Sequence, residues 1–392
     1  MSTPAILGGA PVFESPAPFM RPTLPEFSEI GRELQEIFQT GMVTKGHFLA
    51  EFEAALAGHL GSKHAVGVSS CTTGLVLTYK AADLTDEVVV PSFTFMATVH
   101  PLAWCGLSPV FADVDPDTWN LTPESAEAAI TPSTSAVVAT HVFGNPADVE
   151  ALQNLADRKG IKLLFDAAHG FGALHRGKPV GRYGVAEVFS SSPTKLLVTG
   201  EGGVVSTNDA EVARRVEVGR EYGNPGNYDT EFPGLNARMQ EFCAILGLHS
   251  LKMLDENAER RNRLVDTYRE GLRAVGGIYF QKVDPRDRCS YKDFTVRVVA
   301  DEFGLSRDAL VKSLRAEGID TRNYYDPPVH LHTAYRHLAH LYRGRLPATE
   351  RLARECVSLP IYSHMETEVA LRVCEAIRRI QRHGPAVSAA LS

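Results

Sequence analysis

Three short stretches of the sequence carry side chains that could do chemistry. Lys195 lies in FSSSPTKLLVTGEGG, among small and apolar residues and before a glycine-rich turn. Asp166 closes the apolar run IKLLFD, and SSCTTG at 69–74 brings hydroxyl groups to the start of a predicted helix. Desolvation of a lysine favours its neutral, nucleophilic form. A carboxylate after an apolar strand needs a cationic or hydrogen-bonding partner.

Each of these residues also has an ordinary interpretation. Most lysines keep their ammonium group in water, and Ser70 or Thr72 could be a helix N-cap. Asp166 could be a paired structural carboxylate, and His169 a hydrogen-bonded core histidine. The chemical interpretation is favoured by the order of the set: a hydroxyl-rich helix start, then an aspartate at a strand end, then a lysine after the following strand.

The predicted elements would bring these stretches together. Short apolar runs alternate with helical patterns from about residue 50 to residue 210, which predicts a largely parallel sheet with crossover helices. An open parallel sheet binds its ligands at the carboxyl ends of its strands. The predicted strands are AVGVSS, EVVVPSF, SPVFADV, AVVATHV, KLLFDAA and AEVFSSS.

The second part of the chain has a different pattern. A long loop rich in Gly, Asn and Pro occupies 219–239, and loops of that length are typically functional or reach a partner. A charged helix and a smaller α+β segment follow it. The tail PAVSAALS at 385–392 is expected to fray.

Pyridoxal phosphate (PLP) needs the three features found at these strand ends. Its phosphate needs an anchor, its ring nitrogen an acidic partner, and its aldehyde a lysine. Asp166 would keep the ring nitrogen protonated. Lys195 would form the Schiff base and then shuttle a proton as general base and acid.

Nine ordered stretches of the sequence resemble the DegT/DnrJ/EryC1/StrS (sugar) aminotransferase family of fold-type-I PLP enzymes. The resemblance covers nearly the whole chain. The stretches are ILGGAPVF, FLAEFEAALAGHLGSKHAVGVSSCTTGL, VVVPSFTFMATVHPL, PVFADVDPDTWNL, HVFGNPADV, FDAAHGFGA, FSSSPTKLLVTGEGGVV, GLNARMQEFCAILGL and YYDPPVHLH. The resemblance implies an α/β fold with a mostly parallel seven-stranded sheet flanked by helices. It also implies a large PLP-binding domain with an N-terminal arm (1–250) and a small C-terminal α+β domain (251–392).

The resemblance also assigns roles to individual residues. Lys195 and Asp166 correspond to the catalytic pair, His169 lies beside the cofactor's 3-hydroxyl, and Phe95 stacks over its ring. Asn236 corresponds to a residue that enters the neighbouring subunit's phosphate site. The cofactor-binding positions are Thr72, Thr73, Phe95, Asp166, His169, Ser190, Lys195 and Asn236. The substrate positions are His330 and Tyr324, and no metal site is expected.

The activity implied is the transfer of an amino group from L-glutamate to a keto-sugar, expected to be nucleotide-diphosphate-linked, in amino-sugar biosynthesis. Pyridoxamine phosphate would be the intermediate, and a homodimer would share its active sites. The alternatives are an aminotransferase of a free cyclitol or other cyclic ketone, and a non-catalytic PLP-binding regulator. Two departures from the family pattern, Cys71 and the run Ser191-Ser192-Pro193, concern the substrate side of the pocket.

Composition excludes several other classes of protein. The net charge of −7 disfavours a nucleic-acid partner. The six scattered cysteines form no CxxC pair, which favours reduced thiols in a cytoplasmic protein over a disulfide framework or a zinc site. No apolar run approaches the roughly 18 residues of a membrane span, so no membrane association is expected.

Overall fold

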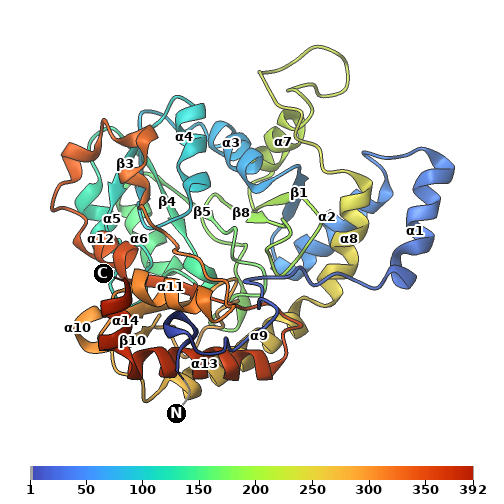
Figure 1. The fold of residues 1–392 in the computed structure, drawn as a ribbon. Coiled ribbons are helices and arrows are strands. Elements are labelled where there is room, and N and C mark those ends of the chain that lie inside the picture. Colours follow the sequence, from blue (N-terminus) through green and yellow to red (C-terminus); the bar gives the residue numbers. More distant parts are fainter. Residues whose placement is uncertain (1–2, 392) are drawn as a thin grey trace.

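A seven-stranded sheet forms the centre of the computed structural model, which describes residues 3–391 (Figure 1). The strand order is β1-β9-β8-β5-β4-β2-β3, and β9 alone runs against the other strands. This confirms the mostly parallel sheet predicted from the alternating pattern. The strands are β1 (His64–Val68), β2 (Glu87–Pro91), β3 (Ser108–Ala112), β4 (Thr134–Thr140), β5 (Lys162–Asp166), β8 (Ala186–Ser190) and β9 (Gly203–Thr207).

Helices cover both faces of this sheet, because its strands are apolar on both sides. Val88 and Val90 of β2 pack in one cluster with the helices α3, α4 and α7. Val89 points to the opposite face, which α5 and α6 cover, and α2 and α8 cover the continuation of that face towards β1. The helices of this part are α1 (Phe27–Thr40), α2 (His47–Leu60), α3 (Cys71–Ala81), α4 (His100–Trp104), α5 (Pro123–Ala129), α6 (Val149–Lys159), α7 (Ala210–Gly219) and α8 (Glu241–Lys252).

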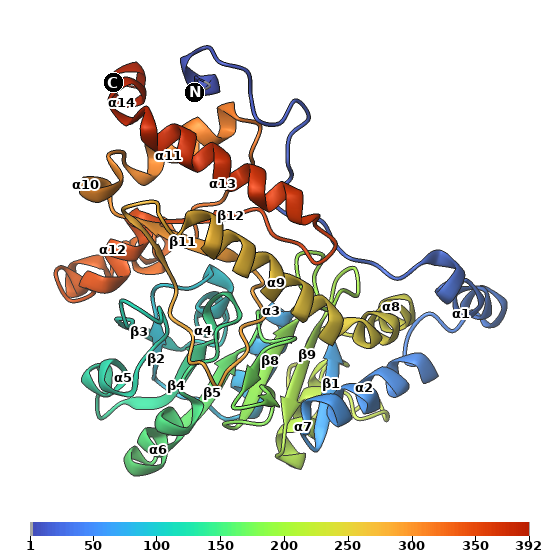
Figure 2. The ribbon, with the colours of Figure 1, turned by 90° about the horizontal axis from the view of Figure 1, so that it is seen from below.

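A second layer of structure lies across the carboxyl edge of the sheet (Figure 2). Its antiparallel sheet has the order β10-β11-β12 and packs against α9, α11 and α13. Phe13 and Ala17 of the N-terminal segment belong to the same core. The elements are α9 (Leu254–Leu272), β10 (Ile278–Phe280), β11 (Phe294–Val298), α10 (Ala300–Phe303), α11 (Arg307–Ala316), α12 (Pro347–Glu355), β12 (Cys356–Leu359), α13 (Thr367–Arg382) and α14 (Gly384–Leu391). The domain boundary at 250/251 stays a prediction.

Two local expectations from the sequence differ from the structure. The residues after the glycine-rich turn were not predicted as a strand, yet they form β9 and pair with both β1 and β8. The expected fraying of the tail is wrong, because residues 384–391 form α14 and the buried side chain of Val387 packs into the C-terminal core.

Within residues 3–391, no helix is both long and apolar enough to cross a bilayer.

The remaining two strands form a small hairpin of β6 (Leu174–His175) and β7 (Lys178–Pro179), which projects from the large sheet towards the C-terminal part. Leu174 also bridges to Arg288, so the hairpin ties the two parts of the chain together.

Candidate active site

A cavity of about 350 Å³ lies where β4, β5 and β8 end. Thr140, Asp166 and Ser190 are the last residues of these three strands, and all three line the cavity. Parallel strands bring their carboxyl ends to one edge of the sheet, which is why residues distant in sequence meet here. The predicted site residues that line it are Thr72, Phe95, Asp166, His169, Ser190, Lys195 and Tyr324.

The N-terminus of α3 forms one wall of the cavity. Ser70 caps the helix by accepting a 3.1 Å hydrogen bond from the backbone N–H of Thr73, and Thr73 Oγ1 accepts from the N–H of Ser70 in return. Free N–H groups and the helix dipole make such a terminus suited to a phosphate. A Cβ on Gly203 would lie 2.5 Å from the backbone nitrogen of Cys71, so glycine is required for β9 to approach the helix this closely.

Asp166 lies buried at the end of β5. Its Oδ1 accepts a 3.0 Å hydrogen bond from the N–H of Ala168, and its Oδ2 accepts one of 2.7 Å from Thr98 Oγ1. Burial raises the pKa of Asp166, and these two hydrogen bonds oppose the rise. A carboxylate in this environment gains most from a nearby cation, such as a protonated ring nitrogen.

Lys195 reaches the cavity from the turn after β8, where its N–H donates a 3.0 Å hydrogen bond to Ser192 O. Within residues 3–391, Lys195 Nζ makes no hydrogen bond or ion pair. Burial, aided by the charge of Lys292, lowers the pKa of Lys195 to about 7, although Asp293, Cys71 and Asp166 oppose the shift. A substantial fraction of this amine is therefore neutral and nucleophilic at neutral pH.

Aromatic side chains flank the cavity. The ring of His169 stacks on Phe143 with 14° between the ring planes and a centroid distance of 6.3 Å. Burial lowers the pKa of His169 well below its usual value, and Lys195, Lys292 and His141 lower it further, so His169 is a neutral hydrogen-bonding group. Phe95 also lines the cavity and is 47% exposed, so its side chain is accessible to a flat ligand.

These residues fit PLP. The cavity volume lies within the range of small-molecule sites. The capped N-terminus of α3, with Thr72 in its first turn, would hold a phosphate. Asp166 would hold a protonated ring nitrogen, and Lys195 offers an amine whose pKa is about 7 to an aldehyde. Phe95 would cover the ring.

Three of the predicted residues do not line this cavity. The hydroxyl of Thr73 is taken up by Ser70 in the helix cap. Asn236 is exposed, next to the loop that follows α7. His330 is buried, and its Nδ1 lies 2.7 Å from Ser92 Oγ. In one copy of the chain, Asn236 and His330 are thus outside the pocket that Lys195 lines.

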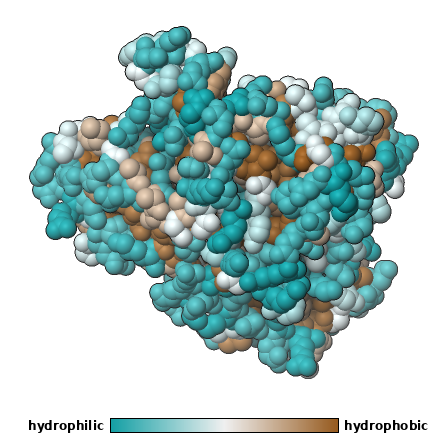
Figure 3. Space-filling view, turned by 180° about the vertical axis from the view of Figure 1, so that it is seen from behind, coloured by the Kyte–Doolittle hydropathy of each residue, from teal (hydrophilic) through white to brown (hydrophobic). Residues whose placement is uncertain are grey.

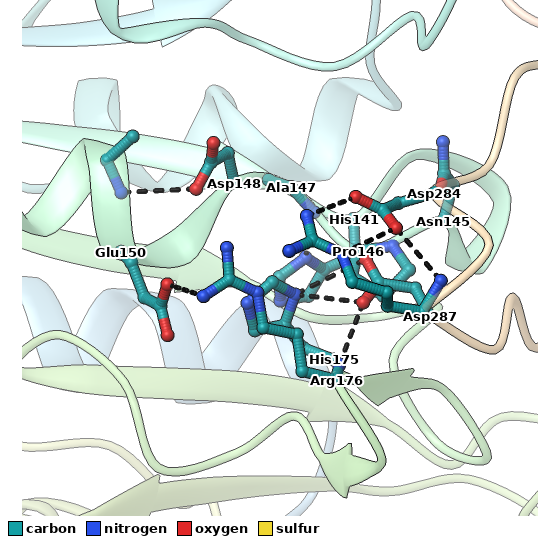
Figure 4. Close-up of polar contacts among 12 residues, drawn as sticks. His141, Asn145, Pro146, Ala147, Asp148, Glu150, His175, Arg176, Asp284 and Asp287 are labelled. Carbon is teal, nitrogen blue, oxygen red and sulfur yellow. Dashed lines mark hydrogen bonds and ion pairs between the residues drawn. The ribbon is translucent and has the colours of Figure 1, made fainter.

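The sequence did not identify several residues that the structure brings to the site. Thr98 holds Asp166, and Lys292 and Asp293 line the cavity from just before β11. His141 follows β4, and its ring stacks on Phe165 at 5.1 Å. Its position near the end of the predicted strand AVVATHV was the one available signal. Figure 4 shows His141 beside Ala147, whose N–H donates a 3.0 Å hydrogen bond to His141 Nδ1.

Comparison with known proteins places this geometry in context. The chain matches the model of the DegT/DnrJ/EryC1/StrS aminotransferase family over residues 26–378. It is 34% identical to the "pleiotropic regulatory protein" of Geobacillus stearothermophilus, over 91% of this chain and 95% of that protein. It is 37% identical to dTDP-3-amino-3,4,6-trideoxy-alpha-D-glucose transaminase of Streptomyces venezuelae, over 90% of this chain and 92% of that protein. The crystal structure of DesI in the presence of its TDP-sugar product matches with a TM-score of 0.91 and 37% identity, over 98% of each chain.

Proposed function

Because the chain belongs to the DegT/DnrJ/EryC1/StrS aminotransferase family, we propose that it transfers an amino group from L-glutamate to a keto-sugar linked to a nucleotide diphosphate. The observation that carries this proposal is the convergence of Lys195, Asp166 and the N-terminus of α3 on one cavity. That arrangement supplies an amine, a carboxylate and a phosphate anchor together, which PLP chemistry requires.

The roles of the residues follow from their environments. Bound PLP supplies an aldehyde that takes up amines and a ring that withdraws electrons from the substrate carbon. Asp166 keeps a proton on the ring nitrogen, and the N–H groups at the start of α3 bind the phosphate. Lys195 Nζ would take the proton from the substrate carbon that carries the amino group and pass it to the former aldehyde carbon of PLP. With the keto-sugar it would move the proton in the opposite direction. Its pKa of about 7 suits both directions, because a general acid–base works best near the operating pH.

The acceptor is proposed from the relatives. The Streptomyces venezuelae relative is named for a dTDP-linked amino-sugar, and the DesI structure was determined with a TDP-sugar. The cavity offers hydroxyl and charged side chains from Tyr324, Lys292 and Asp293 next to Lys195. These groups are suited to a polyhydroxylated ring, and a sugar therefore fits better than an apolar ketone.

We also propose that the enzyme is a homodimer with shared active sites. The large side chains of Phe27, Phe38, Met42 and Val43 are exposed on and just after α1, with Phe38 at 80%. Tyr228 is 96% exposed in the loop that projects from the body after α7 (Figure 1). Figure 3, which views the molecule from behind relative to Figure 1, shows hydrophobic patches on an otherwise largely hydrophilic surface. Exposed apolar surface of this kind is typical of a protein interface.

Asn236 supports the same proposal. It lies at the end of the projecting loop, is exposed, and is absent from the lining of the cavity in its own chain. A residue that completes the neighbouring subunit's phosphate site would have this placement. His330 stays a weaker substrate candidate, because it is buried against Ser92.

We further propose a cytoplasmic location, which the six free cysteines support.

The alternative of a PLP-binding regulator is favoured by the name of the Geobacillus stearothermophilus relative. The half-reactions separate the two functions. L-glutamate should convert the yellow PLP-loaded protein to the colourless pyridoxamine form, and a panel of dTDP-, UDP- and GDP-linked keto-sugars should restore the yellow form and yield an amino-sugar detectable by mass spectrometry. Free cyclic ketones belong in the same panel. Conversion by none of these acceptors would favour the regulator.

A further inference from the structure

A buried ion pair lies in the wall of the cavity. Lys292 Nζ is 2.9 Å from both carboxylate oxygens of Asp293, and the two side chains are 7% and 2% exposed. The residues are adjacent in sequence and directly precede β11. Both line the cavity together with Lys195 and Tyr324, and Lys292 Nζ lies 5.5 Å from the centre of the Tyr324 ring. The pair therefore belongs to the site, and the roles proposed above for holding the cofactor do not involve it.

The backbone of this pair is fixed in place. The N–H of Lys292 donates a 3.0 Å hydrogen bond to Phe143 O, just beyond the end of β4. The carbonyl of Lys292 accepts a 2.9 Å hydrogen bond from Arg261 Nη1, and the same nitrogen donates to Tyr291 O at 3.0 Å. Ser290 Oγ donates to His169 O at 2.7 Å. The pair is thus held rigidly against the wall that carries His169.

A second set of contacts holds the chain that leads to this pair. Figure 4 shows Asp287 facing the β6–β7 hairpin, where its Oδ1 accepts a 2.8 Å hydrogen bond from the N–H of Arg176 and lies 3.2 Å from His175 Nδ1. Arg176 in turn pairs with Glu150 on α6. The segment before Lys292 is therefore attached to the large sheet's helices and hairpin at one end and to Phe143 at the other.

The pair has hydrogen-bonding capacity that the described residues do not use. Within residues 3–391, Lys292 Nζ and the Asp293 carboxylate hydrogen-bond only to each other. An ammonium has three N–H donors and a carboxylate about four acceptor sites, so both groups can bind a further partner from the cavity. Burying such a pair is costly unless additional hydrogen bonds satisfy it, which indicates a polar ligand at this wall.

The charges select the class of that ligand. The pair is neutral overall, so an anionic group that approached Lys292 would also meet the negative charge of Asp293. A hydroxyl group has both a donor and acceptors, and it can therefore satisfy the carboxylate and the ammonium at once. We propose that the Lys292–Asp293 pair binds ring hydroxyl groups of the hexose acceptor, an inference that rests on the proposed function. By the same charge argument, the pair is not expected to bind the carboxylates of the amino donor.

Binding measurements test this inference without turnover. Calorimetric Kd values of dTDP-glucose, UDP-glucose and GDP-mannose, each compared with dTDP, UDP or GDP alone, give the contribution of the hexose. For the PLP-loaded wild type, we expect the hexose to tighten binding of at least one nucleotide about tenfold. For Asp293→Asn, we expect this gain to fall to about threefold or less, while the affinity for the nucleotide alone stays unchanged. The double variant Lys292→Met/Asp293→Asn should behave likewise and avoids leaving a lone buried charge.

Asp284→Asn is the matched control, because Asp284 lies in the same segment but forms its ion pair with Arg286 at the surface. It should keep the full hexose gain. The inference is overturned if no hexose tightens binding to the wild type, if the variants keep the gain, or if they weaken the bare nucleotides as much as the sugar nucleotides.

The L-glutamate half-reaction separates this inference from the proposed function. A wild type that binds the hexose but takes no nitrogen from L-glutamate would refute the proposed function and leave the hydroxyl site standing.

Discussion

Thr98 Oγ1 donates a 2.7 Å hydrogen bond to Oδ2 of Asp166, across 68 residues of sequence. Thr98 ends a short helical turn after β2, and its hydroxyl is also 2.7 Å from that of Thr94. Both threonines are buried. The bond favours the ionised form of a carboxylate whose pKa burial raises, so Thr98 is a positioning residue for the group that would hold the cofactor's ring nitrogen.

Replacing Thr98 by Val should therefore raise the pKa of Asp166 further. The carboxylate form exists above the pKa, so the acid limb of the kcat/KM profile should move to higher pH by about one unit. Thr98→Ser keeps the hydroxyl and should keep the wild-type profile. An acid limb that is identical in Thr98→Val and wild type would show that the bond does not tune Asp166.

The pKa of Lys195, lowered to about 7 chiefly by burial, governs capture of the cofactor. The neutral amine is the reactive form. The rate at which cofactor-free protein takes up PLP, followed by absorbance, should rise about tenfold per pH unit below 7 and level off above it, after correction for titration of PLP itself. An inflection near pH 10, as for an ordinary lysine, would contradict the lowered pKa of Lys195.

Arg261 is expected to be important for stability as well as for the site. Its buried guanidinium donates to the carbonyls of Tyr291 and Lys292 and to Ser363 Oγ. Arg261→Met leaves these acceptors without a donor and should lower the free energy of unfolding by about 2–4 kcal/mol, measured by urea denaturation. Arg260→Met removes an exposed pair with Glu256 and should change it by less than about 0.5 kcal/mol. Equal losses in both variants would refute the role of Arg261.

Complementation tests the shared active site. Asn236→Ala should weaken PLP retention, and Lys195→Ala should abolish activity, each as a homodimer. In a mixed dimer, one of the two sites would have both an intact Lys195 and an intact Asn236, and activity should return to part of the wild-type level. Mixed dimers verified by native mass spectrometry that stay inactive would exclude a contribution of Asn236 in trans.

The residues that sequence reasoning located are those fixed by local rules. Asp166, Ser190 and Lys195 end a strand or follow one, and the carboxyl edge of a parallel sheet is a general place for ligands. Thr73 also obeys a local rule, but a different one: it lies three positions after Ser70, which is the spacing of a capping box. Its hydroxyl serves the helix, while the phosphate site depends on the backbone N–H groups around it.

The residues that sequence reasoning missed depend on contacts between distant segments. Thr98 reaches Asp166 through a turn whose path the sequence pattern does not specify, and Lys292 and Asp293 come from the C-terminal part. A Lys-Asp dipeptide before a strand is most often a surface pair. Only the tertiary structure, in which the N–H of Lys292 donates to Phe143 O, reveals that Lys292 is part of the cavity. The burial of His330 against Ser92 is likewise a tertiary feature.

The central claim is that Lys195, and no other lysine, attaches the cofactor. Reduction of the PLP-loaded protein with borohydride makes the attachment permanent, and peptide mapping by mass spectrometry then identifies the modified residue. The account predicts a single modified lysine, Lys195, and no modification after Lys195→Ala. Lys292 lines the same cavity and serves as the internal comparison. A label on Lys292, or the same label in Lys195→Ala, would contradict the account.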